Sequence, residues 1–459
     1  MGVISAIFWG VTSLSFLVFI HEGGHYLSAR LTGMRVTEFY LGLPCSIKWF
    51  HKSKRYGTEI GVTPILLGGY TRICGMEGTD DPRLAPVLAY IQQQGRVSIE
   101  EVEKQFNCSE DDACTMLATL ADWAAIEEYW KPERSNRYRR KYMPDGYQTV
   151  KRDAHLLTEF DRESDFTSSE GVTVAGEPRD LGMSPEEFLQ HEKKHTYGGH
   201  GFWSRIITLF MGPLINLLFA FLIVVLALTL AGVDVTANKN VIGAVSEDSL
   251  AQASGLEAGD TVESINGETV TDWQSLTQAL QPALQAHQDF EMVIERGGQE
   301  QTIEVQPDPN GSQTLLGISA PTEHLNIDIR HACLVSLSYA QQVAQAAVSL
   351  IIPTHTTEVL NQSTSIMGIS VMASEAASGG VWEFSLFVAA ISMSLGFMNL
   401  LPIPPLDGGK ILIEIIQAII RRPLSQKVQV GISYIGLAFF IFIFIFITRN
   451  DIARFVVGQ

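Results

Sequence analysis

The stretch "FIHEGGHYLSAR", residues 19–30, places a His-Glu-x-x-His pattern directly behind a run of apolar residues. That run, at about 3–20, is close to the roughly 20 residues that a helix needs to cross a bilayer. It lacks the basic start of a secretory signal, and cleavage behind it would fall beside the two histidines. We therefore interpret residues 1–31 as a retained transmembrane helix that carries the pattern.

Three further apolar runs of similar length follow in the chain. Together with the first run they predict a polytopic α-helical membrane protein with about four transmembrane helices. The other three are expected at 203–232, 384–410 and 428–448.

The distribution of charge predicts the orientation of these spans. Residues 32–202 carry 21 Lys and Arg, whereas residues 233–383 carry three against 19 Asp and Glu. The positive-inside rule then places 32–202 and 404–427 in the cytoplasm and 233–383 outside. The formal net charge of −18 comes largely from the outer segment, so nucleic acid is an unlikely partner.

Residues 32–76 are rich in β-branched and aromatic residues between Gly and Pro, which predicts a small antiparallel β-sheet at the cytoplasmic side of the membrane. Within it, "ILLGGYTRI" (65–73) is apolar for a cytoplasmic hairpin. It could be a loop that dips back into the bilayer or a strand that packs on its neighbours, and periodicity does not decide between them.

Residues 77–200 form a cytoplasmic insertion. Its part at about 82–142 predicts short helices followed by the basic stretch "KPERSNRYRRKYMP" (131–144), an order that resembles a winged helix. Such a fold can bind DNA or a regulatory protein. We favour a cytoplasmic regulator, because basic residues near a membrane are expected from the positive-inside rule alone. Residues 143–200 are expected to be a weakly structured linker.

The outer segment predicts one compact domain at 238–322. Its stretch "GLEAGDTVESINGETV" (255–270) resembles the core of a PDZ domain, with an Asn-Gly hairpin turn. A PDZ domain can take an extended peptide by strand addition, or it can merely block access, and both alternatives stay open. Residues 323–383 are expected to be an extracytoplasmic linker with an amphipathic helix at about 335–352.

The His-Glu-x-x-His pattern has a chemical interpretation. His21 and His25 are four residues apart, so both imidazoles leave one face of a helix and can share a metal ion. Glu22 can then act as the general base toward a metal-activated water. Ionisable residues inside a membrane are costly, which favours a functional interpretation. Gly23 and Gly24 would leave room for another backbone beside the metal.

A catalytic zinc takes three protein ligands, and Asp407 in "NLLPIPPLDGGK" (399–410) could supply the third. From Val3 to His21 a helix rises roughly 27 Å, near the inner face of the hydrocarbon. The third span, which passes inwards, brings Asp407 to a comparable depth. Its prolines break the helix, and irregular backbone is tolerated at that depth where it lines a polar cavity.

Asn216 lies inside the second span, in "FMGPLINLLFA" (210–220). It could bond a neighbouring helix. It could also donate to a substrate carbonyl or an oxyanion at the site.

Three motifs together resemble the site-2 protease family of intramembrane zinc metalloproteases, and within it the bacterial regulator-of-sigma-E (RseP-like) branch. They are His21-Glu22-Gly23-Gly24-His25, Gly212-Pro213-x-x-Asn216, and Asn399-x-x-Pro402-x-Pro404-x-Leu406-Asp407-Gly408. The resemblance implies Zn²⁺ on His21, His25 and Asp407, with Glu22 as the base. It implies that Asn216 and Asn399 hold the scissile peptide. It also implies that Gly68, Gly69 and Tyr70 belong to a membrane-reentrant β-loop that pairs with an unwound substrate.

The same resemblance implies a zinc endopeptidase of the bacterial cytoplasmic (inner) membrane that acts in regulated intramembrane proteolysis. Its substrate would be the transmembrane segment of a single-pass protein, an anti-sigma factor or a signal-peptide remnant. The active site would lie near the cytoplasmic face and the PDZ domain outside. The single PDZ unit and the insertion at 77–200 depart from the family pattern, which leaves the control of the enzyme open.

Two functions of other classes compete with this interpretation. One is a catalytically silent receptor, against which the intact Glu22 argues. The other is a metal transporter, which would need more intramembrane ligands.

Overall fold

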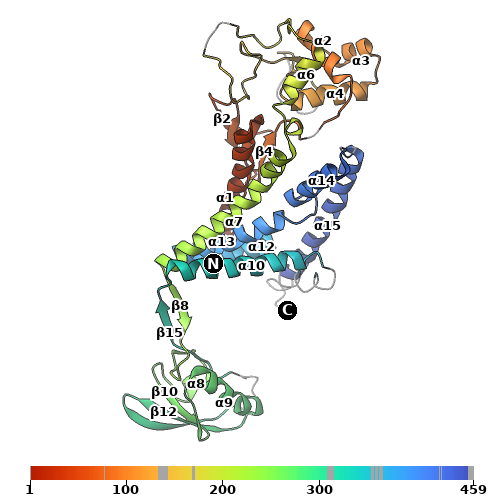
Figure 1. The fold of residues 1–459 in the computed structure, drawn as a ribbon. Coiled ribbons are helices and arrows are strands. Elements are labelled where there is room, and N and C mark those ends of the chain that lie inside the picture. The colour runs from red at the N-terminus through yellow and green to blue at the C-terminus, as the bar shows by residue number, and fades with distance from the viewer. Residues whose placement is uncertain are drawn as a thin grey trace. The chain divides into compact units, whose positions relative to one another are not determined.

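The structure is a computed structural model of the 459-residue chain, and its elements are drawn in Figure 1. It describes residues 2–76, 78–132, 143–167, 171–307, 315–352, 356, 360, 365–422, 424 and 426–452. The chain divides into two compact units, Met1–Val224 with Val335–Gln459, and Val225–Leu334. Each unit is described by itself.

Within the described residues, four helices are long and apolar enough to cross a membrane, as the sequence predicts. These spans are Val3–Thr32 (α1), Phe202–Leu230 (α7), Val381–Asn399 (α13) and Val428–Arg449 within α15, Gln426–Ile452. The first helix continues without a break through the His-Glu-x-x-His pattern. It ends at Gly33, which takes the left-handed conformation (φ 93°) that commonly terminates helices.

The predicted third helix, 384–410, is two helices in the structure. α13 ends at Asn399, and a second helix, Asp407–Ile420 (α14), begins after a non-helical segment at 400–406. Pro402, Pro404 and Pro405 lie in this segment, and their rings prevent the helix from continuing. The break makes Asp407 the first residue of a new helix.

The segment before the third span contains the predicted helix, found at Ile329–Ser349 (α10), and a second helix that was not predicted, Ile366–Gly379 (α12). α12 packs along α1. The Ser5 and Ser374 hydroxyls are 2.8 Å apart. A Cβ added to Gly10 would lie 2.2 Å from the Ser370 oxygen, so the helices touch there. α12 is rich in Gly, Ser and Ala, and small residues of this kind let two helices approach closely.

The predicted sheet is present, but it is mixed and not antiparallel. Its strands are Val36–Leu41 (β1), Trp49–Lys52 (β2), Glu59–Val62 (β3) and Gly69–Ile73 (β4), in the order β2-β3-β1-β4. β3 returns from its hairpin with β2 and pairs with β1 in parallel, whereas β4 pairs with β1 antiparallel. In the predicted strand 65–73 only the part from Gly69 is a strand, and β4 lies at the edge of the sheet.

The insertion contains three helices and a three-stranded sheet ordered β5-β7-β6. Its elements are Leu84–Gln94 (α2), Arg96–Val97 (β5), Ile99–Phe106 (α3), Glu110–Asp122 (α4), Ile126–Tyr129 (β6) and Gly146–Thr149 (β7). Ser98 and Ser109 cap α3 and α4, because each side chain accepts from the backbone N–H of the acidic residue three positions later, Glu101 or Asp112. Most of the basic stretch, 133–142, lies outside the described residues.

Residues 143–200 are not the weakly structured linker that the sequence suggested. They supply β7, the helix Pro185–Lys193 (α6) and the 3₁₀ turn Tyr197–Gly199 (η1), and Phe188 of α6 lies in the hydrophobic core of the insertion. Their polar composition is misleading because several of their charged residues are buried in ion pairs.

That ion-pair network joins the insertion to the start of β1. Arg35, fully buried, pairs with Asp161 at 2.6 Å and with Glu192 at 2.8 Å, and Arg152 pairs with Glu192 at 2.7 Å. Burial by itself would raise the pKa of Asp161 and Glu192. The neighbouring arginine charges outweigh burial and hold the pKa of both carboxyls below the ordinary range. The Arg35 N–H also donates to the His195 carbonyl at 2.8 Å, so the insertion is fixed to the sheet.

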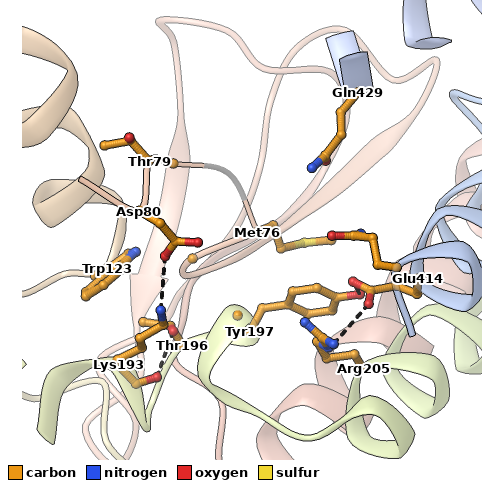
Figure 2. Close-up of a pocket in the computed structure, with 14 residues that line it drawn as sticks. Met76, Thr79, Asp80, Trp123, Lys193, Thr196, Tyr197, Arg205, Glu414 and Gln429 are labelled. Atoms are coloured by element: carbon orange, nitrogen blue, oxygen red, sulfur yellow. Dashed lines mark hydrogen bonds and ion pairs between the residues drawn. The ribbon is translucent and has the colours of Figure 1, made fainter. Parts of the chain in front are cut away.

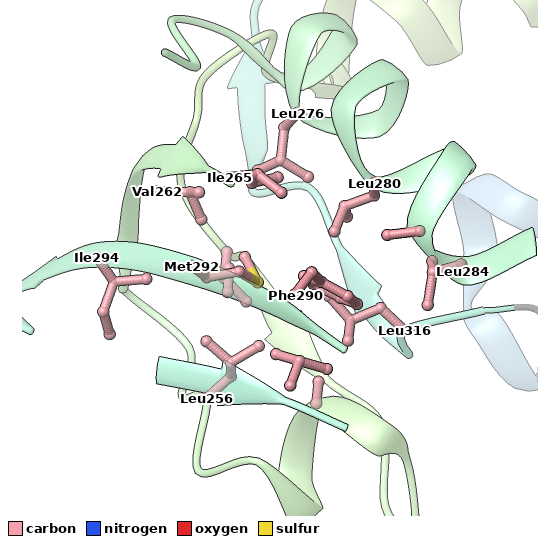
Figure 3. Close-up of a cluster of buried hydrophobic side chains, with 14 of the residues drawn as sticks. Leu256, Val262, Ile265, Leu276, Leu280, Leu284, Phe290, Met292, Ile294 and Leu316 are labelled. Atoms are coloured by element: carbon pink, nitrogen blue, oxygen red, sulfur yellow. The ribbon is translucent and has the colours of Figure 1, made fainter. Parts of the chain in front are cut away.

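The second unit is built on a four-stranded antiparallel sheet in the order β11-β10-β12-β13. Its members are Thr261–Ile265 (β10), Glu268–Thr269 (β11), Phe290–Arg296 (β12) and Gln299–Val305 (β13). Helix Trp273–Ala286 (α9) contributes Leu276, Leu280 and Leu284 to the core shared with this sheet (Figure 3). The remaining elements are Val233–Thr236 (β8), Ala244–Val245 (β9), Leu250–Ala253 (α8), Ile318–Ser319 (β14) and Thr322–Leu325 (β15). β8 pairs with β15, so the two segments by which the chain enters and leaves this unit lie side by side.

Candidate metal centre

The two histidines of α1 lie where their spacing predicts. They leave the same face of the helix, both side chains are buried, and their Nε2 atoms are 3.3 Å apart. This proximity is local, because it follows from one turn of helix between them.

Asp407 completes the group from the other end of the chain. Its Oδ2 lies 3.0 Å from His21 Nε2 and 3.2 Å from His25 Nε2. Ligand atoms of the three residues all lie within 4.8 Å of one another, and all three residues are buried. The structure therefore brings together the three residues that the sequence proposes as ligands.

The donor set and its dimensions fit zinc. Two imidazole nitrogens and one carboxylate oxygen are the ligands of a catalytic zinc site, which keeps a fourth position open. With bonds of about 2.0–2.1 Å, two ligand atoms of a tetrahedral zinc lie roughly 3.3 Å apart. The triangle of 3.0, 3.2 and 3.3 Å has nearly this size, so the site can accept the ion with shifts of a few tenths of an ångström.

Helix α7 orients both imidazoles. The Thr208 carbonyl oxygen lies 2.8 Å from His25 Nδ1, so Nδ1–H donates to it and Nε2 is left for the metal. The Asn216 amide, fully buried, has its Nδ2 3.4 Å from His21 Nδ1, while its Oδ1 lacks a hydrogen-bond partner. Exchanging the two amide atoms gives Oδ1 the Nδ1–H of His21 as its donor and again leaves Nε2 for the metal. Asn216 is thus placed to orient His21.

The close crossing of α1 and α7 depends on Gly24. A Cβ added there would lie 2.5 Å from the Met211 carbonyl oxygen, and a Cβ added to Gly212 would lie 2.3 Å from His25 Nε2. The expectation that a glycine of the pattern admits another backbone is confirmed at Gly24. It is wrong at Gly23, where an added Cβ would meet only the Phe39 ring, at 4.0 Å.

The edge strand β4 begins beside Glu22. An added Cβ on Gly69 would lie 3.3 Å from Glu22 Cγ, and the Thr71 hydroxyl donates to the Glu22 carbonyl at 3.0 Å. Glu22 itself is half-buried. The proposed base and an edge strand of the sheet therefore lie next to each other.

The other predicted substrate-binding residues lie around this strand or at the end of α13. The Gly68 carbonyl accepts from the Gly42 N–H at 2.7 Å. The Tyr70 hydroxyl donates to Glu38 at 2.7 Å, and its ring stacks on Tyr40. The Asn399 amide donates to the Leu395 carbonyl within its own helix at 3.0 Å. Of the predicted substrate-binding residues, Gly69 thus lies against Glu22 and Asn216 against His21 of the His-Glu-x-x-His pattern.

The comparison with protein families identifies the class of protein to which the chain belongs. The family described as "Peptidase family M50" matches residues 9–443, nearly the whole chain. The chain belongs to peptidase family M50. The predicted resemblance to site-2 proteases, which form this family, is confirmed.

Relatives of this M50 peptidase match it from end to end. The chain is similar to "Probable protease eep" of Enterococcus faecalis, at 26% identity over 96% of both chains. It is similar to "Regulator of sigma-W protease RasP" of Bacillus subtilis, at 27% over 95% of this chain and 96% of the relative. It is also similar to "Zinc metalloprotease RasP" of Geobacillus kaustophilus, at 26% over 96% of both chains. This M50 peptidase is a bacterial membrane protein and a zinc metalloprotease.

Sequence reasoning missed the partner of His25. In this M50 peptidase that partner is the main-chain carbonyl of Thr208, and every residue carries a carbonyl, so no side chain marks it. The nearby Gly212-Pro213 pair was a signal that the backbone of α7 is unusual at this point, but it does not identify the acceptor.

Proposed function

We propose that this M50 peptidase hydrolyses a peptide bond within the membrane-spanning segment of a single-pass membrane protein. His21, His25 and Asp407 would hold Zn²⁺, and Glu22 would be the general base. The observation that carries the proposal is the buried triangle of two Nε2 atoms and one Oδ2, built from residues 386 positions apart.

The chemistry divides between the ion and the chain. When bound, zinc lowers the pKa of a water molecule and polarises a carbonyl. Glu22 follows His21 directly and is half-buried, so its carboxylate can take a proton from water at the centre. It would return that proton to the amine that leaves when the C–N bond breaks.

Substrate alignment is proposed along β4. A transmembrane helix hides its peptide bonds in its own hydrogen bonds, so it must unwind before hydrolysis. An edge strand offers free N–H and C=O groups to an extended segment. β4 lies at the sheet edge and begins beside Glu22, which would bring a segment paired near Gly68, Gly69 and Tyr70 to the centre. Asn399 would help to hold the scissile peptide, and Asn216 could do so in addition to orienting His21.

The sheet is proposed to reach into the membrane interface. Several large apolar side chains of this region are exposed, although a packed strand would bury them: Leu43, Ile47, Trp49, Phe50, Ile65 and Leu67. Contact with lipid would remove this apolar surface from water. This favours the reentrant interpretation of residues 65–73 over a strand that only packs on its neighbours.

The substrate class is proposed from chemistry and from one relative. An anti-sigma factor or a signal-peptide remnant would present a single apolar helix of the required kind. One relative carries the name "Regulator of sigma-W protease", which points to the first of these. By the charge distribution, the enzyme would lie in the cytoplasmic membrane with its centre near the cytoplasmic face.

The insertion is proposed to be a winged-helix module that binds a protein regulator. Its helix–strand–helix–helix–strand–strand order and its sheet order suit that fold. Helix α4, which would face DNA in a DNA-binding member, carries Glu110, Asp111, Asp112 and Asp122 and no Lys or Arg. This charge would repel a phosphate backbone, so a DNA partner is disfavoured.

The second unit is proposed to be the PDZ domain. Its four-stranded sheet with α9, and the hairpin at Asn266, agree with the sequence interpretation of 238–322. It would either capture a freed chain end or exclude substrates that still carry a large outer domain. Cleavage of one transmembrane segment with a small and with a large outer domain distinguishes these roles, since only exclusion makes cleavage depend on size.

The test uses the full-length chain in a lipid nanodisc, with a model single-pass substrate and a measurement of bound zinc. Glu22→Gln should abolish cleavage and retain zinc, whereas His25→Ala should lose both. Glu110→Gln, an exposed carboxylate of the insertion, is the matched control and should change neither. Full cleavage by Glu22→Gln, or a wild-type chain without zinc, would contradict the proposal.

A further inference from the structure

Helix α14 carries a second buried carboxylate, Glu414, seven residues after Asp407. Seven residues are close to two helical turns, so Asp407 and Glu414 share one face with Ile411 between them. Asp407 and Glu414 are buried, as are Gly408 and Gly409, whereas α14 exposes Leu412, Ile415, Ile416 and Ile419. The contacts of α14 with its own unit therefore run along the face that begins with the metal ligand.

Glu414 is held by two residues from other elements. The Tyr197 hydroxyl donates to its Oε1 at 3.0 Å, and Arg205 Nη2 lies 3.2 Å from its Oε2 (Figure 2). Tyr197 belongs to η1 at the end of the insertion, and Arg205 belongs to α7. A buried carboxylate is costly without such partners, so these contacts fix the position of Glu414.

Tyr197 is itself a fixed point. Its N–H donates to the Cys74 carbonyl at 2.8 Å. Its side chain belongs to one buried cluster with residues of α1, β1, β4 and α7, namely Ala29, Val36, Ile73 and Leu209, and the half-buried Ile411 of α14 packs against this cluster. The elements that carry His21, His25 and the Thr208 carbonyl thus meet at this tyrosine.

The side of Glu414 away from this cluster is open. Glu414, Tyr197 and Arg205 border a polar cavity of about 170 Å³, which is also lined by Gln417, Gln429 and the Lys193–Asp80 ion pair (Figure 2). Close packing would hold α14 in place even without specific bonds, but a cavity leaves it room to move. On the side of the cavity, the hydrogen bond and the ion pair therefore add to the packing of Ile411 in fixing this part of α14.

We propose that Tyr197 and Arg205, acting through Glu414, are positioning residues for Asp407. Their contacts hold α14 at the height and rotation that bring the Asp407 carboxylate to the two histidines. Because Tyr197 ends the insertion, the same contact connects the insertion to the metal centre. The inference rests on the metal centre proposed above.

The test measures zinc release, with the full-length chain loaded with zinc in nanodiscs and then exposed to excess chelator. Tyr197→Phe should release zinc about tenfold faster, the lower end of the effect expected when a residue that supports a ligand is lost. Its kcat should fall more than its KM rises, since the substrate strand is untouched. Tyr147→Phe is the matched control. Tyr147 is equally buried (6% exposed, as is Tyr197) and lies in the core of the insertion, so zinc release should be unchanged.

A double-mutant cycle separates positioning from general loosening. In a Glu414→Leu background, Tyr197→Phe should not increase the rate of zinc release further, because the Glu414 carboxylate through which Tyr197 acts on Asp407 is already absent. If Glu414→Leu does not fold, Glu414→Gln replaces it, and the effect of Tyr197→Phe should be smaller there because the acceptor is neutral. An equal effect of Tyr197→Phe in both backgrounds, or wild-type zinc release by Tyr197→Phe, overturns this inference alone. A wild-type chain that binds no zinc overturns the metal centre, and this inference with it.

Discussion

Replacing Gly24 by alanine tests the crossing of α1 and α7. The new Cβ would lie 2.5 Å from the Met211 carbonyl oxygen, where ordinary carbon–oxygen contacts begin at roughly 3.3 Å. The obstacle is backbone and cannot rotate away, so the helices must part by about 0.8 Å. The same displacement would lengthen the His25 Nδ1 to Thr208 oxygen distance from 2.8 Å to about 3.6 Å, which is no longer a hydrogen bond.

Two consequences follow from that displacement. Overpacking of this kind costs about 1–3 kcal/mol of unfolding free energy. Loss of the bond that orients His25 should weaken zinc binding by about 10- to 100-fold. The assay is zinc competition with a chelator, together with the thermal midpoint of the full-length chain in nanodiscs.

Gly23→Ala is the matched control, one residue away on the same helix. Its Cβ would meet only a ring atom at 4.0 Å, and alanine favours a helix by about 1 kcal/mol over glycine. We expect Gly23→Ala to keep zinc affinity and to equal or exceed the wild-type midpoint. The reasoning is refuted if the two variants behave alike, or if Gly24→Ala binds zinc as the wild type does.

Three further predictions concern contacts other than that of Gly24 with Met211. Asn216→Leu should weaken zinc binding by about 10- to 100-fold, whereas Asn216→Asp, whose carboxylate still accepts from His21, should bind zinc as the wild type does. Zinc affinity is measured by chelator competition. If Asn216 only binds substrate, both variants should keep the wild-type zinc affinity. Asp161→Asn should lower the free energy of unfolding by about 1.5–3 kcal/mol, because buried Arg35 loses one of its two carboxylate partners and keeps Glu192. The folded-state pKa of Asp161 is depressed, so the stability that its carboxylate contributes is present above the unfolded pKa of about 3.9 and is lost as pH falls through the folded pKa. Thermal midpoints of unfolding measured from pH 7 to 3 should therefore vary less in Asp161→Asn than in the wild type. Parallel curves of midpoint against pH for the two proteins would contradict this. Gly10→Ile should separate α12 from α1 and slow substrate cleavage. The control is Ile7→Val, at an exposed position of the same helix. Equal cleavage rates for the two variants would count against the packing of α12 on α1.

Much of the fold could be predicted because its signals are local. The four spans follow from runs of apolar residues, and the caps of α3 and α4 follow from serine followed three residues later by an acidic residue. Composition led to wrong predictions where the same residue types are typical of two different structures. Small residues are typical both of a linker and of a close-packed helix such as α12. A charged stretch such as 143–200 is typical of a solvated chain, but its charges can also form a buried ion-pair network, as they do here. The parallel pairing of β1 with β3 was missed because strand order is a long-range property.

The sequence by itself determined the chemistry that the centre can perform. The spacing of His21 and His25 fixes two imidazoles on one helical face, and the prolines before Asp407 force a new helix to begin there. Only the tertiary structure decided how these parts meet. The Thr208 carbonyl that orients His25, the approach of Gly24 to α7 and the contact of Tyr197 with Glu414 each join elements far apart in the chain. Backbone spacing sets geometry within one helix, whereas geometry between helices depends on packing, for which the sequence carries no local signal.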